Sequence, residues 1–283
     1  MPNFEDLPHL LRLLDDDQPD VQSAVRKGLL GFGGDLSSHL ANLAIQLDSK
    51  QRKQLTVLLR PKRREILRAE WQVPRSGLFG THQDWETFES MLRQISDYLH
   101  DGITLRAPLS DGLDLLATEF EEEFGAPSAD DVRQALFVSE RFKGNSADYY
   151  GPQNSDLAWV LENEQGNPLA LSTVFILLGH RLGLEVGACN YPGHFLARAE
   201  IDGDPCLIDC FNKGRLINIP ELLAGTNISG EARAAVRFEA PPGILLKRTL
   251  VNLAHSFARR DEEEDELLAL ELASSLEGLA VAE

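Results

Sequence analysis

The spacing of apolar residues changes along this chain, and that change constrains the fold more than any other feature. Up to about residue 182, apolar side chains recur every three or four residues, as in Leu7, Leu11 and Leu14, which is typical of amphipathic helices. Beyond that point the period becomes two, which indicates short strands separated by turns. These segments are 186–190, 194–201, 205–211 and 216–219. Two further helices follow, so the sequence predicts an α+β fold.

Gly- and Pro-rich segments divide the chain into three predicted regions. Residues 1–75 read as a helical bundle, in which the segment LLRLLDDDQPDVQSAVRKGLL resembles one HEAT-type unit without a second copy at a fixed period. Residues 73–82 (VPRSGLFGTH) are expected to connect this bundle to a domain over 76–240. Residues 241–283 begin with Pro-Pro-Gly and are expected to form a C-terminal helix pair.

Composition and net charge limit the kinds of partner that the protein is expected to bind. The chain has 27 basic and 45 acidic residues and a net charge of −18, which disfavours general binding to nucleic acid or to anionic membranes. The longest apolar stretch, 169–179, is far shorter than the roughly 20 residues that cross a bilayer. The first residues are acidic and lack the basic start of a signal peptide. Three cysteines are an odd number in a long chain, which does not indicate a disulfide framework, and we expect a cytoplasmic protein.

One segment, residues 50–68, reverses the overall sign with eight basic side chains. No aromatic residue lies among them to stack on bases, so a nucleic-acid site is disfavoured. A solvated helix face, or pairing with the protein's own acids, is the simpler interpretation. A helical scaffold that binds an acidic partner through this segment stays open as an alternative.

A predicted hairpin places a histidine and an aspartate together. If Asp202 and Gly203 form a two-residue turn, Leu196 lies opposite Asp209, and His194 is the diagonal neighbour of Asp209 on the same face. The carboxylate can then fix the tautomer of the imidazole and support a general base. A three-residue loop without a bulge would separate the two side chains. The alternative is that His194 ends a strand and Asp209 is solvated.

The segment around this pair resembles a known family. Gly166, the apolar helix that ends in Leu182-Gly183-Leu184, His194 and Asp209 stand in the register of the transglutaminase-like family of papain-type architecture. The P-G-H-F motif at 192–195 is most similar to the YchA-type bacterial branch, which has leading helices and a tetratricopeptide-like helical tail. The resemblance runs from about residue 84 to the C-terminus and is strongest over 148–214. It implies a helix packed on a small antiparallel sheet.

The same resemblance assigns His194 and Asp209 to the family's histidine and aspartate, but it puts Pro168 where the nucleophilic cysteine belongs. Proline suits the first turn of a helix, and Asn167 is a good cap for it. We therefore expect a binding or regulatory module without cysteine-type acyl transfer. Its cleft is expected to recognise a peptide or a side-chain amide. The residues expected around this cleft are Pro168, Ser172, Tyr191, His194 and Asp209.

An enzymatic alternative uses Ser172, four residues after Pro168 on the same helix face. With His194 as base and Asp209 as orienting group, it would form the set of a Ser-His-Asp hydrolase or amidase. Its hydroxyl would lie about 6 Å further along the helix axis than the family's thiol. The cysteines at 189, 206 and 210 are interpreted as buried packing residues, with 206 and 210 on one strand face. Neither a cofactor nor a metal site is expected, since no nucleotide-binding or zinc-protease motif is present.

Overall fold

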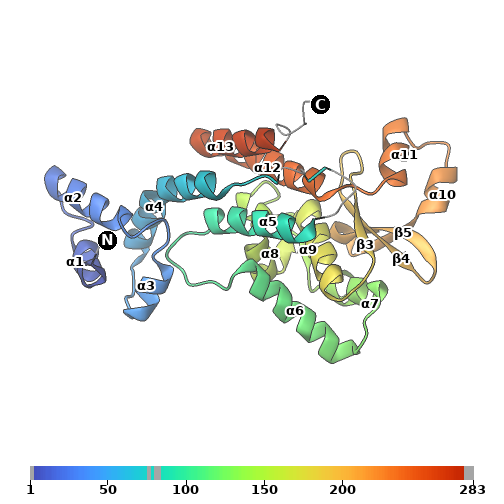
Figure 1. The fold of residues 1–283 in the computed structure, drawn as a ribbon, viewed down its shortest axis with the longest axis horizontal. Helices are drawn as coiled ribbons and strands as arrows, with labels where there is room; N and C mark the ends of the chain where they lie inside the picture. The colour runs from blue at the N-terminus through green and yellow to red at the C-terminus, as the bar shows by residue number, and fades with distance from the viewer. Residues whose placement is uncertain (1–2, 75–77, 80–83, 277–283) are drawn as a thin grey trace. The chain divides into compact units, whose positions relative to one another are not determined.

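A computed structural model describes residues 3–74, 78–79 and 84–276, and within them the chain forms two compact units (Figure 1). The first unit comprises Met1–Trp71 and Asp97–Ala107, and the second comprises Gln72–Ser96 and Pro108–Glu283. Most of the connection predicted at 73–82 lies outside the described residues. The two units are described separately below.

The first unit is a small helical bundle. After a 3₁₀ turn at Phe4–Asp6, four helices follow in order, α1 (Leu7–Arg12), α2 (Pro19–Leu30), α3 (Ser37–Asn42) and α4 (Ser49–Glu70). Asp48 caps α4 in a capping box with Gln51, which satisfies the first free amides of this helix. The apolar faces form one core of Leu7, Leu11, Val25, Leu29, Leu36, Leu40, Leu55, Leu59 and Ile103.

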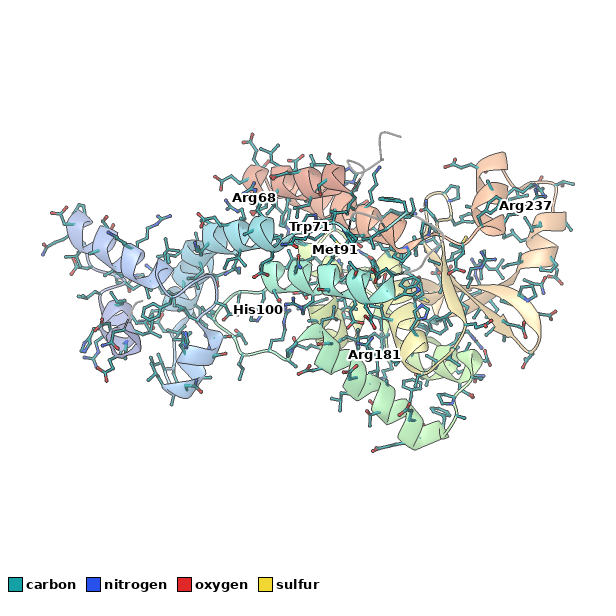
Figure 2. All side chains as sticks on the ribbon, in the orientation of Figure 1. Arg68, Trp71, Met91, His100, Arg181 and Arg237 are labelled. Atoms are coloured by element: carbon teal, nitrogen blue, oxygen red, sulfur yellow. The ribbon has the colours of Figure 1, made fainter. Side chains whose placement is uncertain are left out.

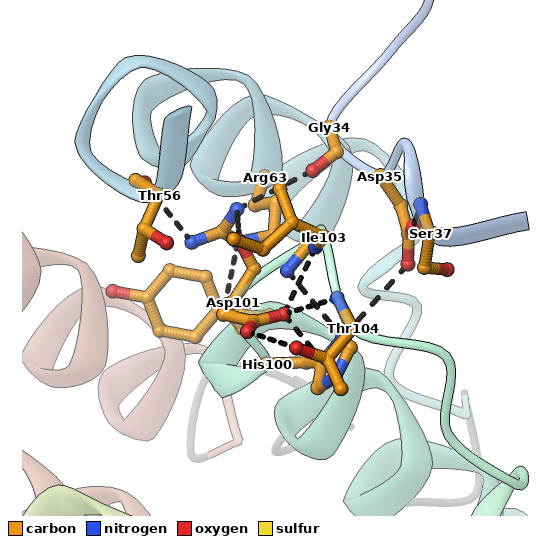
Figure 3. A network of polar contacts seen from close by, with 11 residues as sticks. Gly34, Asp35, Ser37, Thr56, Arg63, His100, Asp101, Ile103 and Thr104 are labelled. Carbon is orange, nitrogen blue, oxygen red and sulfur yellow. Dashed lines mark hydrogen bonds and ion pairs between the residues drawn. The ribbon is translucent and has the colours of Figure 1, made fainter. Parts of the chain in front are cut away.

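A buried arginine joins α4 to two loops of this unit (Figure 3). Arg63 is only 6% exposed, and its guanidinium donates to the backbone carbonyls of Tyr98 (3.1 Å), Asp101 (3.0 Å) and Gly34 (3.3 Å). Burial is the main reason that the pKa of Arg63 falls to about 10. Arg63 of the basic segment 50–68 is therefore a buried structural residue. Its Lys50 and Lys62 pair with Asp15 and Glu65.

The second unit is built around α9 (Pro168–Arg181), whose residues from Pro168 to Gly179 are all buried. A helix that is apolar on every side must be covered on every side. The elements packed against it include α6 (Leu109–Phe124), α7 (Ala129–Arg133), α8 (Leu157–Asn163), α12 (Pro242–Ala258) and the strands β3 and β4. The π-helical turn Gln134–Val138 continues α7, and α5 (Trp85–Leu99) begins in this unit.

A four-stranded antiparallel sheet of order β3-β4-β5-β6 lies against α9 (Figure 1). Its strands are Val186–Cys189, Leu196–Ile201, Asp204–Asp209 and Arg215–Asn218. Ile201 pairs with Asp204 across a two-residue turn, with positive φ at Asp202 (54°) and Gly203 (85°). Positive φ values at both loop residues are those that a tight two-residue turn requires. The hairpin register predicted from the sequence is therefore present in the structure.

Short elements complete the second unit. β1 (Lys143–Gly144) and β2 (Gln165–Gly166) form a parallel pair, and β2 lies just before α9 in the sequence. A 3₁₀ turn at Pro152–Ser155 precedes α8, and α10 (Ile219–Ala224) and α11 (Gly230–Arg237) follow the sheet. The helices α12 and α13 (Glu263–Ser275) lie side by side near the C-terminus. The α+β class predicted from the sequence is confirmed.

Three predicted boundaries are wrong. The strand predicted from His194 begins at Leu196, because residues 191–194 form a turn in which the His194 amide donates to the Tyr191 carbonyl. The strand predicted to reach Phe211 ends at Asp209, whose carboxylate caps a 3₁₀ turn over Cys210–Asn212. Cys206 and Cys210 therefore do not share a strand face. The spacing of Leu36, Leu40, Leu43 and Leu47 predicts a helix that begins at Asp35 and reaches Leu47, but this helix spans only Ser37–Asn42.

Candidate functional site

The histidine and the aspartate predicted to be neighbours form a hydrogen bond. His194 Nε2 lies 2.9 Å from Asp209 Oδ1. His194 stands in the turn that leads into β4, and Asp209 is the last residue of β5, so the hairpin register fixes their separation. The Asp209 side chain is 1% exposed, whereas that of His194 is 26% exposed. The buried Asp209 carboxylate therefore holds the imidazole through Nε2, while part of the ring stays exposed to solvent.

Asp209 is held by a second set of partners. The Asn212 amide donates to Oδ1 (3.2 Å), the Asn212 side chain donates to Oδ2 (2.9 Å), and Arg215 approaches Oδ2 at 3.4 Å. Burial alone raises the pKa of the Asp209 carboxyl, but the hydrogen bonds from His194 and Asn212 outweigh it, so this pKa lies below its ordinary value. Asp209 is therefore an ionised group that orients the imidazole.

Pro168 occupies the first turn of α9, where the resemblance expects a nucleophile. Its ring is buried, and the Asn167 side chain caps the helix by accepting from the Ala170 amide at 2.8 Å. A proline at this position loses nothing as a helix residue, because the amide it lacks has no partner within the helix. It offers no group that could attack a substrate.

Pro168 and His194 line one pocket of about 270 Å³. The other walls come from two segments in which the sequence analysis named no cleft residue, the loop at Tyr149 and Tyr150 and one face of α12. The complete lining is Tyr149, Tyr150, Asn167, Pro168, Leu169, Gly193, His194, Phe195, Arg248, Asn252, His255 and Ser256. Tyr191 is not among these residues and instead packs against a cluster that includes Cys189 and Leu196.

The rim of this pocket is aromatic. Tyr149 and Tyr150 are 43% and 50% exposed and meet edge to face, with ring centroids 5.1 Å apart. Phe211 supports Tyr149 at 5.9 Å, and the Arg259 guanidinium covers the Tyr150 ring at 3.8 Å. Adjacent exposed tyrosines in a turn-rich segment are a signal that sequence reading could have used. Both rings are in contact with neighbouring side chains and still present exposed surface at the rim.

Ser172 lies in the interior of the protein. Its side chain is completely buried, its hydroxyl donates to the Phe195 carbonyl at 3.5 Å, and it also interacts with the Cys210 thiol. Within the described part of the chain, no hydrogen bond joins Ser172 to His194. A serine nucleophile needs contact with its base and with a substrate. This geometry does not favour Ser172 in that role.

The three cysteines are buried away from the pocket. Burial raises the pKa of the Cys189 thiol to about 11 and that of the Cys210 thiol to about 12, and it raises the pKa of Cys206 as well. The thiolate is the nucleophilic form of cysteine, and buried apolar surroundings suppress it. None of the three thiols lines the pocket.

Among the described residues, no group of three or more His, Cys, Asp or Glu side chains is arranged to hold a metal ion. No helix within the same residues is both long and apolar enough to cross a membrane.

Comparison with known proteins assigns the domain that carries this site. Residues 107–239 match the model of the transglutaminase-like superfamily. The match contains the sheet, α9, His194 and Asp209, but it ends before α12, which supplies Arg248 to the pocket.

The relatives of the chain include bacterial and animal proteins. A UPF0162 protein of Xylella fastidiosa is 35% identical over 137 residues, which are 46% of this chain and 49% of that protein. UPF0162 protein PA3419 of Pseudomonas aeruginosa is 34% identical over 106 residues, 36% of this chain and 38% of that protein. F-box only protein 21 of mouse is 28% identical over 164 residues, 54% of this chain and 25% of that protein.

The matched segment spans about half the length of the Xylella relatives. No solved structure matches the chain significantly.

Proposed function

We propose that this protein is a non-catalytic binding module that recognises a peptide or protein segment in the pocket beside His194. The observation that carries the proposal is the composition of the pocket around α9. A proline stands at the first turn of this helix, while the imidazole and its carboxylate partner keep the geometry of a catalytic pair. The base is present, and the group that it would activate is absent.

The side chains that could replace a nucleophile do not support catalysis. Acyl transfer needs a nucleophile within hydrogen-bond reach of the base and open to the substrate. Ser172 is completely buried, and the three thiols are buried with raised pKa values. The serine hydrolase considered from the sequence is therefore disfavoured, and binding is the remaining use of the pocket.

The size and lining of the pocket support a peptide as ligand. Its volume of about 270 Å³ is below the range of roughly 300–1,000 Å³ typical of small-molecule sites, which favours one side chain or chain end. Exposed tyrosines at the rim offer an apolar surface with polar tips, a common composition of protein interfaces. The likeness to F-box only protein 21 also supports a protein or peptide as partner.

The first experiment tests for catalysis. Purified full-length protein is incubated with a fluorescent primary amine and a glutamine-containing peptide, and separately with the peptide alone to detect hydrolysis. We expect no product above the rate without protein. Product formation that disappears in His194→Ala would contradict the proposal, because it would show that the imidazole still serves a nucleophile.

The second experiment tests for binding. A random peptide array is probed with the wild-type protein, and the peptides it selects are measured against two variants. His255→Trp places a large ring at the exposed edge of the pocket and should abolish binding. Arg237→Trp makes the same addition at the end of α11, outside the pocket, and should leave binding unchanged (Figure 2). An array without selected peptides, or binding that survives His255→Trp, would overturn the proposal.

A further inference from the structure

We infer that the pocket binds its peptide through a carboxylate, and that Arg248 is the residue that receives this group. The inference rests on the proposed function and adds the chemical class of the ligand. It follows from how Arg248 is fixed, from the absence of an acidic partner for it, and from the polarity of the other lining residues.

Arg248 is held in place by neutral acceptors. Its Nη1 donates to the Asn190 side-chain oxygen at 2.5 Å and to the His194 carbonyl at 3.2 Å, and its guanidinium lies over the Phe195 ring at 5.4 Å. One edge of the planar group is therefore anchored to the turn that carries His194. An anchored guanidinium loses less conformational freedom when it binds a ligand.

The positive charge of Arg248 has no acidic partner within the described residues. Two other partly buried arginines of the same unit pair with acids, Arg181 with Glu89 and Asp114 and Arg141 with Glu119 and Glu164. Arg233, which is also partly buried, donates to backbone carbonyls but lies outside this pocket. Burial lowers the pKa of Arg248, as expected for a cation in partly apolar surroundings. In a chain with 45 carboxylates, an arginine left without one in a pocket points to a ligand that brings its own.

The rest of the lining favours a single negative charge. No aspartate, glutamate or lysine lines the pocket, and the remaining polar groups are amides, hydroxyls and imidazoles. A carboxylate matches the two-pronged geometry of one guanidinium. A phosphate monoester carries up to two charges and is usually bound by clustered cations, so it fits this pocket less well. The pocket therefore suits an acidic side chain or the free end of a peptide.

The test uses blocked amino acids of nearly equal size. N-acetyl-glutamate N-methylamide carries one side-chain carboxylate, N-acetyl-glutamine carries one chain-end carboxylate, and N-acetyl-glutamine N-methylamide is neutral. Each is titrated into the full-length protein while NMR follows the backbone amides of residues 193–195 and the Arg248 side chain. We expect at least one acid to bind about tenfold or more tightly than the neutral compound. The stronger of the two acids identifies the source of the carboxylate.

Two variants separate a local effect from a change in net charge. Arg248→Gln should weaken binding of the preferred acid about tenfold or more and leave the neutral compound unaffected. Arg237→Gln removes the same charge outside the pocket and should change affinity less than about twofold. Circular dichroism and the dispersion of the NMR spectrum verify that Arg248→Gln is folded.

Three outcomes would overturn the inference. These are equal binding of the acids and the neutral compound, unchanged binding of the acid in Arg248→Gln, and inorganic phosphate binding more tightly than either acid. Each of these outcomes leaves the proposed function intact if the peptides selected on the array bind the wild-type protein and fail to bind His255→Trp. Catalytic turnover that depends on His194, or an array without selected peptides, would instead remove the proposed function itself.

Discussion

At the scale of single residues, a histidine that is hydrogen-bonded to a buried aspartate and a proline that starts a helix line or adjoin the same pocket. Asp209 orients His194, as a carboxylate does in many hydrolases. Pro168, in contrast, starts a buried helix. The two roles are independent, because a histidine–aspartate pair also stabilises the end of a hairpin. The histidine–aspartate pair can therefore serve the fold without a nucleophile beside it.

The Asp209 carboxylate makes a testable contribution to stability. Asp209→Asn should lower the free energy of unfolding by about 1–3 kcal/mol at pH 7, because a buried group then loses charge-assisted hydrogen bonds. Denaturant unfolding followed by circular dichroism measures this difference. The pKa of Asp209 is lowered in the folded state, so its contribution is complete above the unfolded value of about 3.9.

The stability that the Asp209 carboxylate contributes should disappear as the pH falls through its lower pKa in the folded state. Below that pH, Asp209 is protonated in both the folded and the unfolded protein. We expect the stability difference between wild type and Asp209→Asn to shrink from pH 5 towards pH 2. A difference that grows on acidification would contradict the assignment of Asp209 as the ionised partner.

At the scale of elements, several stretches of irregular chain are fixed by single side chains. Arg63 on α4 bonds the backbone at Gly34, Tyr98 and Asp101, and the Asp101 carboxylate in turn accepts from the amides of Ile103 and Thr104 (Figure 3). Carbonyls of a loop that packs against a helix need donors. Arg63 provides several from one position, so it acts as a structural residue.

We expect Arg63→Lys to destabilise the first unit by about 3 kcal/mol, because a lysine cannot donate to all of these carbonyls from one planar group. Hydrogen exchange of the α4 amides measures the opening of this helix. Arg52→Lys is the matched control, since Arg52 is an exposed residue of the same helix, and it should change stability by less than about 0.5 kcal/mol. Equal protection of α4 in the two variants would show that Arg63 is not essential.

The short strand β1 supports the rim of the pocket. A Cβ at Gly144 would lie 2.6–2.8 Å from three atoms of the Phe211 ring, which itself contacts Tyr149. Gly144→Ala must therefore displace Phe211, and we expect array peptides to bind at least about threefold more weakly as the rim shifts. Gly230→Ala, at a position with open space and an ordinary φ, is the control and should bind normally. Fluorescence anisotropy with one selected peptide gives both affinities.

At the scale of the whole molecule, contacts between residues that are close in the sequence could be predicted, whereas a pocket assembled from distant segments could not. His194 and Asp209 are fifteen residues apart, and one two-residue turn determines their register, so residue arithmetic was enough to place them together. The strand ends were predicted less well, because the turn at Gly193 and the capping role of Asp209 depend on particular hydrogen bonds. Periodicity does not report such bonds.

The pocket itself could not be derived from the sequence. Its walls come from Tyr149 and Tyr150, from the start of α9, and from Arg248 and His255 on α12. The sequence predicted a helix pair over 241–283, and α12 is its first helix, but helical periodicity carries no information about which element a helix face meets. The contact between Arg248 and the turn at His194 spans 54 residues and is visible only in three dimensions.

This contact has a consequence for how the protein can be divided. The segment recognised as transglutaminase-like stops at residue 239, yet the arginine that braces its histidine turn is contributed by the helix that follows. A fragment cut at the end of the matched segment would retain the hairpin and lose the side chain proposed to receive the ligand. Any fragment used to test the proposed binding should therefore include α12 as well as the matched segment.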